Sequence, residues 1–342
     1  MESNQLAKRF IIFAEQECAG SSELYEFLSL KIANDSELLE LSSHVQAGQP
    51  VPNLFFGAVH YLLLKDRNHE LSEYYPSIFE KPKEYEASFP DFKAFCLKRR
   101  KQIAAILQER IVQTNEVRRC GYLYPIFTHI YTAVKKPLSL IEIGTSAGLQ
   151  LLWDKYAYTY NSEEVYGDID SNVHIQSTIK GGTIPPISKR CPPVDKRFGV
   201  DLHINDMSDF EDSLWLNALI WPEHKERRLL FEQAALCQMH NRAEINLIEG
   251  DGIGRLEGLS KEIPKDSVIC IFHTHVANQM TADVKNRLID NVKKIGERRD
   301  VFHIYNNIWD GDLHLDSFIG GKETNERIAR TDGHGKWFEW FL

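Results

Sequence analysis

Apolar residues recur three or four positions apart through the first third of the chain. Examples are Leu6, Phe10, Phe13, Leu24, Phe27 and Leu28. This spacing puts apolar side chains on one face of an amphipathic helix. Residues 53–65 and the long segment that begins at residue 89 continue the pattern, and strand patterns are nearly absent. The pattern predicts an all-helical N-terminal domain over residues 1–134.

The pattern changes at Lys136-Pro137, where short β-rich runs begin to alternate with helical ones. The predicted strands are residues 138–143, 197–202, 245–249, 267–273 and 301–306, and the predicted helices are 149–158, 223–239 and 281–297. Strands that alternate with helices favour a parallel sheet with helices on both faces. Residues 312–342 hold no long helix and predict one or two antiparallel strands. The fold class is therefore an α/β domain over residues 135–342.

One stretch of this second domain does not fit the alternation. Residues 160–196 are polar and contain four prolines, at positions 185, 186, 192 and 193. Proline and polar clusters are typical of loops. We expect a long loop or small excursion inserted into the α/β domain.

The most informative segment is a turn of small residues that follows the first predicted strand. Glu142 ends the apolar run, and Gly144-Thr145-Ser146-Ala-Gly148 leads into the next predicted helix. Glycine lets a ligand approach the backbone closely, and a helix start offers free N–H groups. A nucleotide-like ligand fits this geometry.

The spacing favours one ligand class over two alternatives. Dinucleotide-binding turns follow G-x-G-x-x-G, and this sequence has Ser146 where the second glycine is needed. An acidic residue followed by x-Gly-x-x-x-Gly is typical of S-adenosylmethionine (SAM) binding. Glu142, Gly144, Thr145, Ser146 and Gly148 are therefore predicted to seat SAM. A glycine turn that holds no ligand remains an alternative.

The same residues also spell G-x-S-x-G, the nucleophile elbow of α/β-hydrolases. His334 lies late in the chain with acids such as Asp310 before it, which is the hydrolase order. Against this interpretation, the preceding 134 residues lack the earlier strands that the elbow requires, and no HGGG-type segment precedes it. The serine hydrolase with Ser146 as nucleophile is the less favoured interpretation.

Acids at the ends of later strands extend the SAM hypothesis. Asp201 ends the second predicted strand, where a carboxylate can accept both ribose hydroxyls. Asp168 and Asp170 lie nearer the expected distance from the turn but in a setting unlike a strand. Asp251, with Gly252, is predicted to face the adenine, although Asp-Gly is also a common turn.

Two histidines, His273 and His275, follow the fourth predicted strand. Ligands of open α/β sheets bind at the carboxyl ends of the strands, so either histidine is a candidate general base. Structural hydrogen bonding is the alternative for both. The pair is interpreted as a poor metal site, and no metal is predicted.

Composition and charge narrow the location and the partners. The chain has 342 residues and a net charge of −9. Nucleic-acid binding depends on neutralising phosphates, and the one dense basic run, 98–101, fits a solvated helix face. The six cysteines form no CxxC pair, and no apolar run reaches the length of a membrane span. The sequence predicts a cytoplasmic protein with a small-molecule substrate, no nucleic acid and no membrane partner.

Several segments together resemble the uncharacterised bacterial family known as domain of unknown function 2332. They are 58–64, 113–120, 142–156, 215–222, 272–274 and 333–340, and they span most of the chain. The resemblance implies a SAM-methyltransferase-like fold without an established activity. It directs attention to Asn115, Glu116 and Arg119. If this segment is helical, Asn115 and Arg119 share a face.

Asn115 and Arg119 are predicted to bind the cofactor, and Glu116 to bind the cofactor or act on the substrate. Arg119 could hold the carboxylate of SAM, because a guanidinium matches a carboxylate. Glu116 could hold the ammonium group of SAM or the substrate, and it is a candidate catalytic residue. A helix cap and a domain-joining ion pair are the alternative.

The sequence thus favours a SAM-dependent methyltransferase of a small or medium-sized acceptor, with the helical domain shaping the acceptor pocket. Methyl transfer depends mainly on alignment, so a catalytic base is not required. A SAM- or nucleoside-binding protein without turnover is the second hypothesis. The acceptor and the oligomeric state stay open.

Overall fold

A computed structural model describes residues 3–342, and within it the chain divides into two compact units. The helical unit holds residues 3–114 and 209–229, and the sheet unit holds 115–208 and 230–342. The sequence placed the boundary at residue 134 instead. The difference arises because α7 (Cys120–Val134) packs on the sheet unit, where Phe127 stacks on Trp153 and meets Phe272 edge-on.

Residues 3–114 form helices joined by turns, by a π-helix (Ala14–Cys18) and by two short 3-10 helices. The helices of this unit are α1 (Ser3–Phe13), α2 (Glu23–Ile32), α3 (Ser36–Ser42), α4 (Val51–Lys65), α5 (Phe89–Lys98), α6 (Arg100–Glu109) and, from the returning segment, α8 (Phe210–Ala218). Ser22 caps α2 by accepting the N–H of Tyr25 at 3.1 Å. Aromatic rings fill the core, and Tyr25 stacks on Phe56 with centroids 4.1 Å apart.

The sheet unit is built on nine strands in the order β5-β12-β11-β10-β9-β8-β1-β6-β7. Their bounds are β1 (Leu138–Ile143), β5 (Thr178–Lys180), β6 (Val194–Asp201), β7 (Asn246–Glu249), β8 (Val268–His273), β9 (Val301–Tyr305), β10 (Leu313–Ile319), β11 (Lys322–Thr331) and β12 (Trp337–Trp340). Strands β7, β6, β1, β8 and β9 run parallel, and β10, β11 and β12 follow antiparallel. The predicted α/β class and the largely parallel sheet are confirmed.

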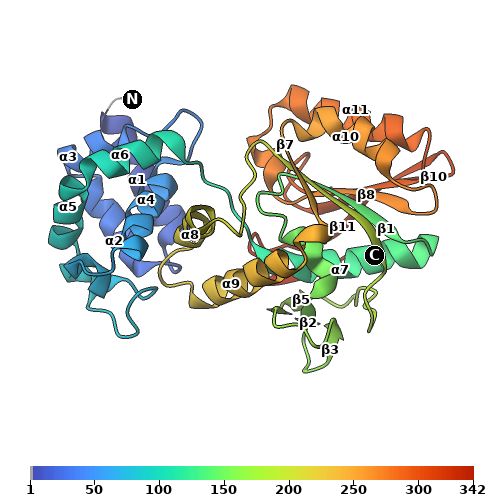
Figure 1. The fold of residues 1–342 in the computed structure, drawn as a ribbon, viewed down its shortest axis with the longest axis horizontal. Coiled ribbons are helices and arrows are strands. Elements are labelled where there is room, and N and C mark those ends of the chain that lie inside the picture. The colour runs from blue at the N-terminus through green and yellow to red at the C-terminus, as the bar shows by residue number, and fades with distance from the viewer. Residues whose placement is uncertain (1–2) are drawn as a thin grey trace. The chain divides into compact units, whose positions relative to one another are not determined.

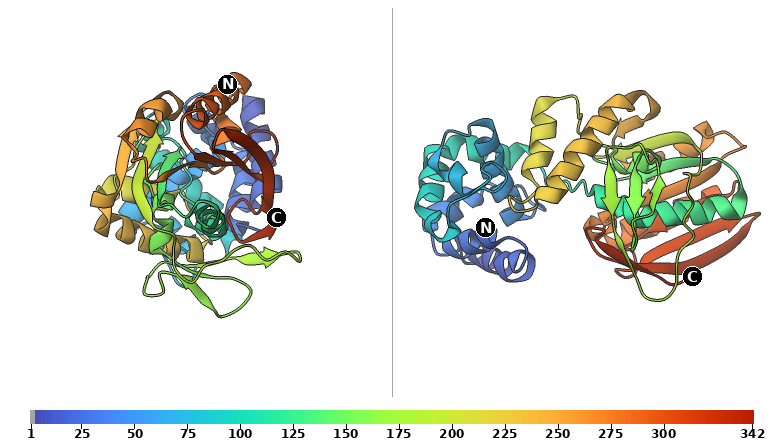
Figure 2. Two further views of the ribbon diagram at one scale, coloured as in Figure 1. Left: turned by 90° about the vertical axis from the view of Figure 1, so that its right-hand side faces the viewer. Right: turned by 90° about the horizontal axis from the view of Figure 1, so that it is seen from below.

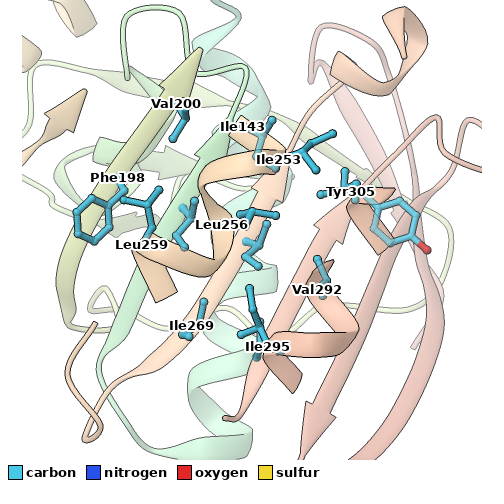
Figure 3. Close-up of a cluster of buried hydrophobic side chains, with 14 of the residues drawn as sticks. Ile143, Phe198, Val200, Ile253, Leu256, Leu259, Ile269, Val292, Ile295 and Tyr305 are labelled. Carbon is cyan, nitrogen blue, oxygen red and sulfur yellow. The ribbon is translucent and has the colours of Figure 1, made fainter. Parts of the chain in front are cut away.

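Helices cover both faces of this sheet, so its central strands are buried throughout. Every residue of β1 and β8 is buried, as expected for parallel strands between two helical layers. Helices α10 (Gly252–Glu262) and α11 (Ala282–Gly296) lie on one face and α7 on the other (Figure 1). Ile143, Val200 and Leu256 belong to the apolar cluster between the sheet and helices α10 and α11 (Figure 3).

The connection from β1 to β6 departs from the sequence prediction. The expected helix over 149–158 is wrong: a 3-10 helix, η5 (Gln150–Lys155), breaks at Leu152 and is followed by β2 (Ala157–Thr159). The expected insertion is a folded excursion. In it β3 (Val165–Gly167) and β4 (His174–Gln176) flank β2 in a small sheet, drawn in light green in Figure 2.

The remaining predicted elements need smaller changes. Helix α9 (Lys225–His240) and α11 lie within three residues of their predicted bounds. The end of the chain supplies three antiparallel strands, one more than the sequence indicated. Among residues 3–342, no helix combines the length and the apolar character that crossing a membrane would require.

Candidate functional site

The carboxyl ends of four parallel strands meet at one edge of the sheet. Glu142 of β1 lies opposite Gly199 of β6 and Phe272 of β8, and His273 lies opposite Tyr305 of β9. The loops that leave these strands therefore start side by side. We call this place the carboxyl edge.

The turn after β1 is held in a conformation that needs glycine. Gly144 and Gly148 have φ of +74° and +75°, a region costly for other residues. A side chain on Gly144 would also place its Cβ 2.4 Å from a methyl group of Val276. Gly148 is similarly covered by Leu247. These glycines serve close packing within the protein.

Every N–H group of this turn already has an acceptor inside the protein. The bonds run from Gly144 and Thr145 to the Val200 carbonyl (2.8 and 3.3 Å), from Ser146 to Asp201 (2.8 Å), from Ala147 to Asn115 (3.3 Å) and from Gly148 to the Thr145 carbonyl (2.9 Å). The N–H groups of Gly144–Gly148 are therefore not the free donors that the sequence predicted for a ligand. A ligand beside this turn would be held by other groups of the carboxyl edge.

Glu142 and Asp201 place two carboxyl groups beside the turn. Glu142 is 4% exposed and accepts the Thr145 hydroxyl at 2.5 Å. Burial raises its pKa from 4.5 to about 8; the Asp201 charge adds to this, while the Thr145 hydrogen bond and Arg119 oppose it. Asp201 accepts the Ser146 N–H and, more weakly, the His203 N–H at 3.3 Å. Both predicted residues thus stand at the carboxyl edge.

The other predicted acids lie in different settings. Asp251 caps α10 by accepting the Ile253 N–H at 3.1 Å, and it lies 3.6 Å from Arg287. Its side chain is 59% exposed, and the neighbouring Gly252 packs against Ile143. Asp168 and Asp170 follow β3 in the excursion, outside the nine-stranded sheet.

The segment before α7 reaches the turn, although not as a helix. Residues 111–116 have no regular secondary structure, and a 3-10 turn, Val117–Arg119, begins after them. The predicted shared helical face of Asn115 and Arg119 is therefore wrong. Asn115 nevertheless donates to the Ser146 hydroxyl at 2.8 Å. Arg119 is 7% exposed and donates to the Thr274 carbonyl and hydroxyl at 3.3 Å.

A chain of polar side chains that the sequence did not single out joins these groups. Gln150 donates to the Glu116 carbonyl at 3.3 Å and accepts the Thr274 hydroxyl at 3.2 Å. Asn205 donates to the Ser146 hydroxyl at 3.0 Å. Glu116 is 2% exposed and its carboxylate lies 3.2 Å from Nδ1 of His334. Polar residues in loops give no periodic signal, so only the fold brings them together.

The two histidines after β8 are both engaged in structural contacts. His273 is fully buried, lies 3.2 Å from His303 through their Nε2 atoms, and has its pKa lowered by burial to about 3. His275 contacts Asn306 and Asn307 through its two ring nitrogens, at 3.2 Å each. Burial and, to a lesser extent, Arg119 lower the His275 pKa to about 4. Both imidazoles are neutral at neutral pH.

Ser146 has the backbone of a strained turn but not the partners of a hydrolase nucleophile. Its φ is +52° and it is 3% exposed. Its hydroxyl accepts from two amide groups, those of Asn115 and Asn205, and no histidine among residues 3–342 is hydrogen-bonded to it. Asp310, the acid suggested for a triad, bonds to His314 at 2.8 Å.

Backbone strain concentrates at the carboxyl edge. Four non-glycine residues of the described chain have positive φ, and three of them, Ser146, His275 and Asn307, follow β1, β8 and β9. Such conformations cost on the order of 1–3 kcal/mol each and cluster at functional sites. The strain and the polar side chains independently mark the same edge.

Comparison with known proteins identifies the family. A family profile described as "Uncharacterized protein conserved in bacteria (DUF2332)" matches residues 7–340. The chain belongs to this family. The resemblance inferred from its motifs is confirmed, and the description carries no activity. Comparison with curated proteins and with solved structures gave no match.

Proposed function

We propose that the sheet unit binds SAM at the carboxyl edge and transfers its methyl group to a small or medium-sized acceptor. The observation that carries the proposal is the gathering of polar groups and strained backbone where β1, β6 and β8 end. The parallel strands lie in the order third, second, first, fourth, fifth. In doubly wound sheets of this order, ligands bind where the order reverses, here between β1 and β8.

The side chains of the carboxyl edge, rather than the turn, are the groups that would bind a zwitterionic nucleoside. Asp201 would accept the ribose hydroxyls, Glu142 would face the cationic amino acid portion, and Arg119 would face its carboxylate. SAM supplies an activated methyl group when bound. The N–H groups of the turn, which are bonded within the protein, would make no hydrogen bonds to the ligand, and Val276 packs over Gly144.

That closed turn favours a second candidate, a SAM- or nucleoside-binding protein without turnover. The N–H groups of this turn are hydrogen-bonded within the protein, so they offer few directional contacts that could align SAM for methyl transfer. Such a protein would bind SAM and S-adenosylhomocysteine without consuming SAM. Consumption of SAM with any acceptor pool excludes this candidate.

Isothermal titration with SAM and S-adenosylhomocysteine tests the proposal. We expect micromolar binding that weakens about 10- to 100-fold in Asp201→Asn, because a charge-assisted hydrogen bond is lost. The asparagine keeps an oxygen for the Ser146 N–H, so the turn retains its bond. Gly144 is a poor choice for mutation because any side chain there collides with Val276.

Asp168→Asn is the matched control, since this partly buried residue lies in the excursion, outside the nine-stranded sheet. It should leave both affinities unchanged. Absence of binding to the unmodified protein would refute the SAM site altogether. Weakening by Asp168→Asn alone would move the ribose contact to the excursion.

A further inference from the structure

We propose that Glu116 and His334 form a general-base pair, in which Nε2 of His334 takes a proton from an O–H or N–H group of the substrate. The inference rests on the proposed function in one respect: the atom that loses the proton is the methyl acceptor. It deepens that function by naming the acceptor class, a hydroxyl or a neutral nitrogen that bears hydrogen.

The contact between the two side chains fixes the chemistry of the imidazole. Nδ1 of His334 lies 3.2 Å from a carboxylate oxygen of Glu116. The other oxygen of Glu116 accepts the N–H of Arg118 at 3.2 Å. A carboxylate accepts hydrogen bonds and does not donate, so in the neutral imidazole the proton sits on Nδ1 and Nε2 carries the lone pair.

The side chain of His334 is exposed and that of Glu116 is buried, and a general base has to be accessible to its substrate. The Glu116 side chain is 3% exposed, whereas that of His334 is 46% exposed. The buried carboxylate orients the ring, and the outer part of the ring remains open to a substrate. His273 has no exposed surface, and both ring nitrogens of His275 meet amide groups.

The loop that carries His334 is built to hold it in place. Asp332 accepts the N–H groups of His334 and Lys336 at 3.0 Å each. Arg119 donates from Nε to the Gly333 carbonyl at 3.0 Å. Gly335 has φ of +73° and lies so close to Arg118 that a Cβ would be 2.6 Å from its carbonyl oxygen. Such support is what positions a catalytic side chain.

The same contacts connect the pair to the carboxyl edge. Arg119 bonds to both Gly333 and Thr274, and Gln150 bonds to both Glu116 and Thr274. A Cβ on Gly333 would lie 3.9 Å from the His275 ring. A substrate that reaches the outer side of His334 therefore stands beside the end of β8.

The proton step is balanced within the pair and the substrate. The X–H bond of the acceptor breaks and its electron pair stays on the oxygen or nitrogen. The Nε2 lone pair forms the new N–H bond. The imidazolium that results faces the Glu116 carboxylate, which stabilises its charge, and the proton then passes to water. A positioned base of this kind contributes about 10²- to 10⁴-fold in rate.

Diethyl pyrocarbonate provides a probe that needs no identified substrate. It carbethoxylates a histidine nitrogen that has a free lone pair, and peptide mapping by mass spectrometry gives the rate at each histidine. We expect His334 to react faster than His174, an exposed histidine on β4. The ratio of the two rates should fall about tenfold in Glu116→Gln, the effect of losing one charge-assisted hydrogen bond. An unchanged ratio would overturn the pair.

A second readout separates a catalytic role from a structural one. Transfer of tritium from methyl-labelled SAM into the low-molecular-mass fraction of a bacterial extract should fall at least about 100-fold in His334→Ala and recover in part with added imidazole. Binding of S-adenosylhomocysteine should persist in this variant. If His334→Ala transfers the label as fast as the unmodified protein, the role of His334 as a base is refuted. If the unmodified protein does not bind the nucleoside, the proposed function is refuted instead.

Discussion

Glu142 is a carboxylic acid held out of water at the end of β1. It is 4% exposed, and burial raises its pKa to about 8. The Thr145 hydroxyl donates a hydrogen bond to it at 2.5 Å. In the unfolded chain this carboxyl group loses its proton near pH 4.5, whereas in the folded protein it keeps the proton up to about pH 8. Between these two pH values, ionisation therefore stabilises the unfolded state relative to the folded state. The stability associated with the neutral acid is complete below about pH 4.5 and is lost as the pH rises to about 8.

Glu142→Gln removes the proton and keeps an oxygen for Thr145. We therefore expect the stability of the variant, relative to the unmodified protein, to increase by on the order of a few kcal/mol between about pH 5 and about pH 8. Urea unfolding at the two pH values measures this difference. Glu163→Gln, at an exposed position, is the control and should change little at either pH. A constant difference between Glu142→Gln and the unmodified protein would contradict the raised pKa.

Residue types at strand ends were predictable, whereas their partners were not. Glu142 and Asp201 follow apolar runs, so their position at the carboxyl edge could be inferred from the sequence. Asp201 could not be known to accept the Ser146 N–H, nor Asp251 to cap α10. Those contacts depend on loop conformations that have no periodic signature.

At the scale of elements, the turn between β11 and β12 shows how a short loop can be tied to a distant segment. Gly335 meets the backbone of Arg118, and its carbonyl accepts the Ser177 hydroxyl at 2.8 Å. The loop is thereby fixed from both sides. Its conformation is set by contacts that are more than 150 positions away in the chain.

Two glycines with similar φ allow the energetic cost of this close approach to Arg118 to be measured. Gly335 and Gly321 have φ of +73° and +80°, but a Cβ on Gly321 meets no atom within 4 Å. Gly321→Ala should cost about 1 kcal/mol, the penalty for a left-handed conformation. Gly335→Ala should cost at least about 3 kcal/mol, because the added carbon collides with backbone.

Chemical denaturation of both variants provides the comparison. The diethyl pyrocarbonate reactivity of His334 should also change in Gly335→Ala but not in Gly321→Ala. Equal destabilisation by the two alanines would show that the turn can shift away from Arg118 at little cost.

The short element after β1 explains why one helix was predicted wrongly. The apolar residues of 149–156 resemble a helical run, and consecutive ones are all buried: Leu151, Leu152, Trp153 and Tyr156 are each 0% exposed. A short run of consecutive apolar residues does not distinguish a helix from other buried structure by its periodicity. The excursion that follows then draws the chain into β2.

At the scale of the whole molecule, the chain order and the compact units do not coincide. Residues 209–229 belong to the helical unit, although the segments before and after them belong to the sheet unit. Helix α7 belongs to the sheet unit rather than to the unit of the helices before it.

A fragment of residues 115–342 with 209–229 replaced by a Gly/Ser linker of equal length should fold with one cooperative transition. A fragment that starts at residue 135 lacks α7 and should not fold, because the stacked pair Phe127–Trp153 is lost.

Near-ultraviolet circular dichroism and thermal unfolding of the two fragments test this. Native-like aromatic signals in the shorter fragment would show that the sheet does not need α7. Failure of both fragments would show that the sheet unit depends on the helical unit for its stability.

The sequence by itself determined the alternation of strands and helices, the glycine turn and the acids at strand ends. These follow from local periodicity, because buried parallel strands are continuous apolar runs and turns need particular residues. Only the tertiary structure decided that the turn satisfies its own N–H groups, that α7 joins the sheet and that Glu116 meets His334 across 218 positions. Such contacts join loops far apart in the chain, where hydrogen bonding and close packing leave no pattern in the order of residues.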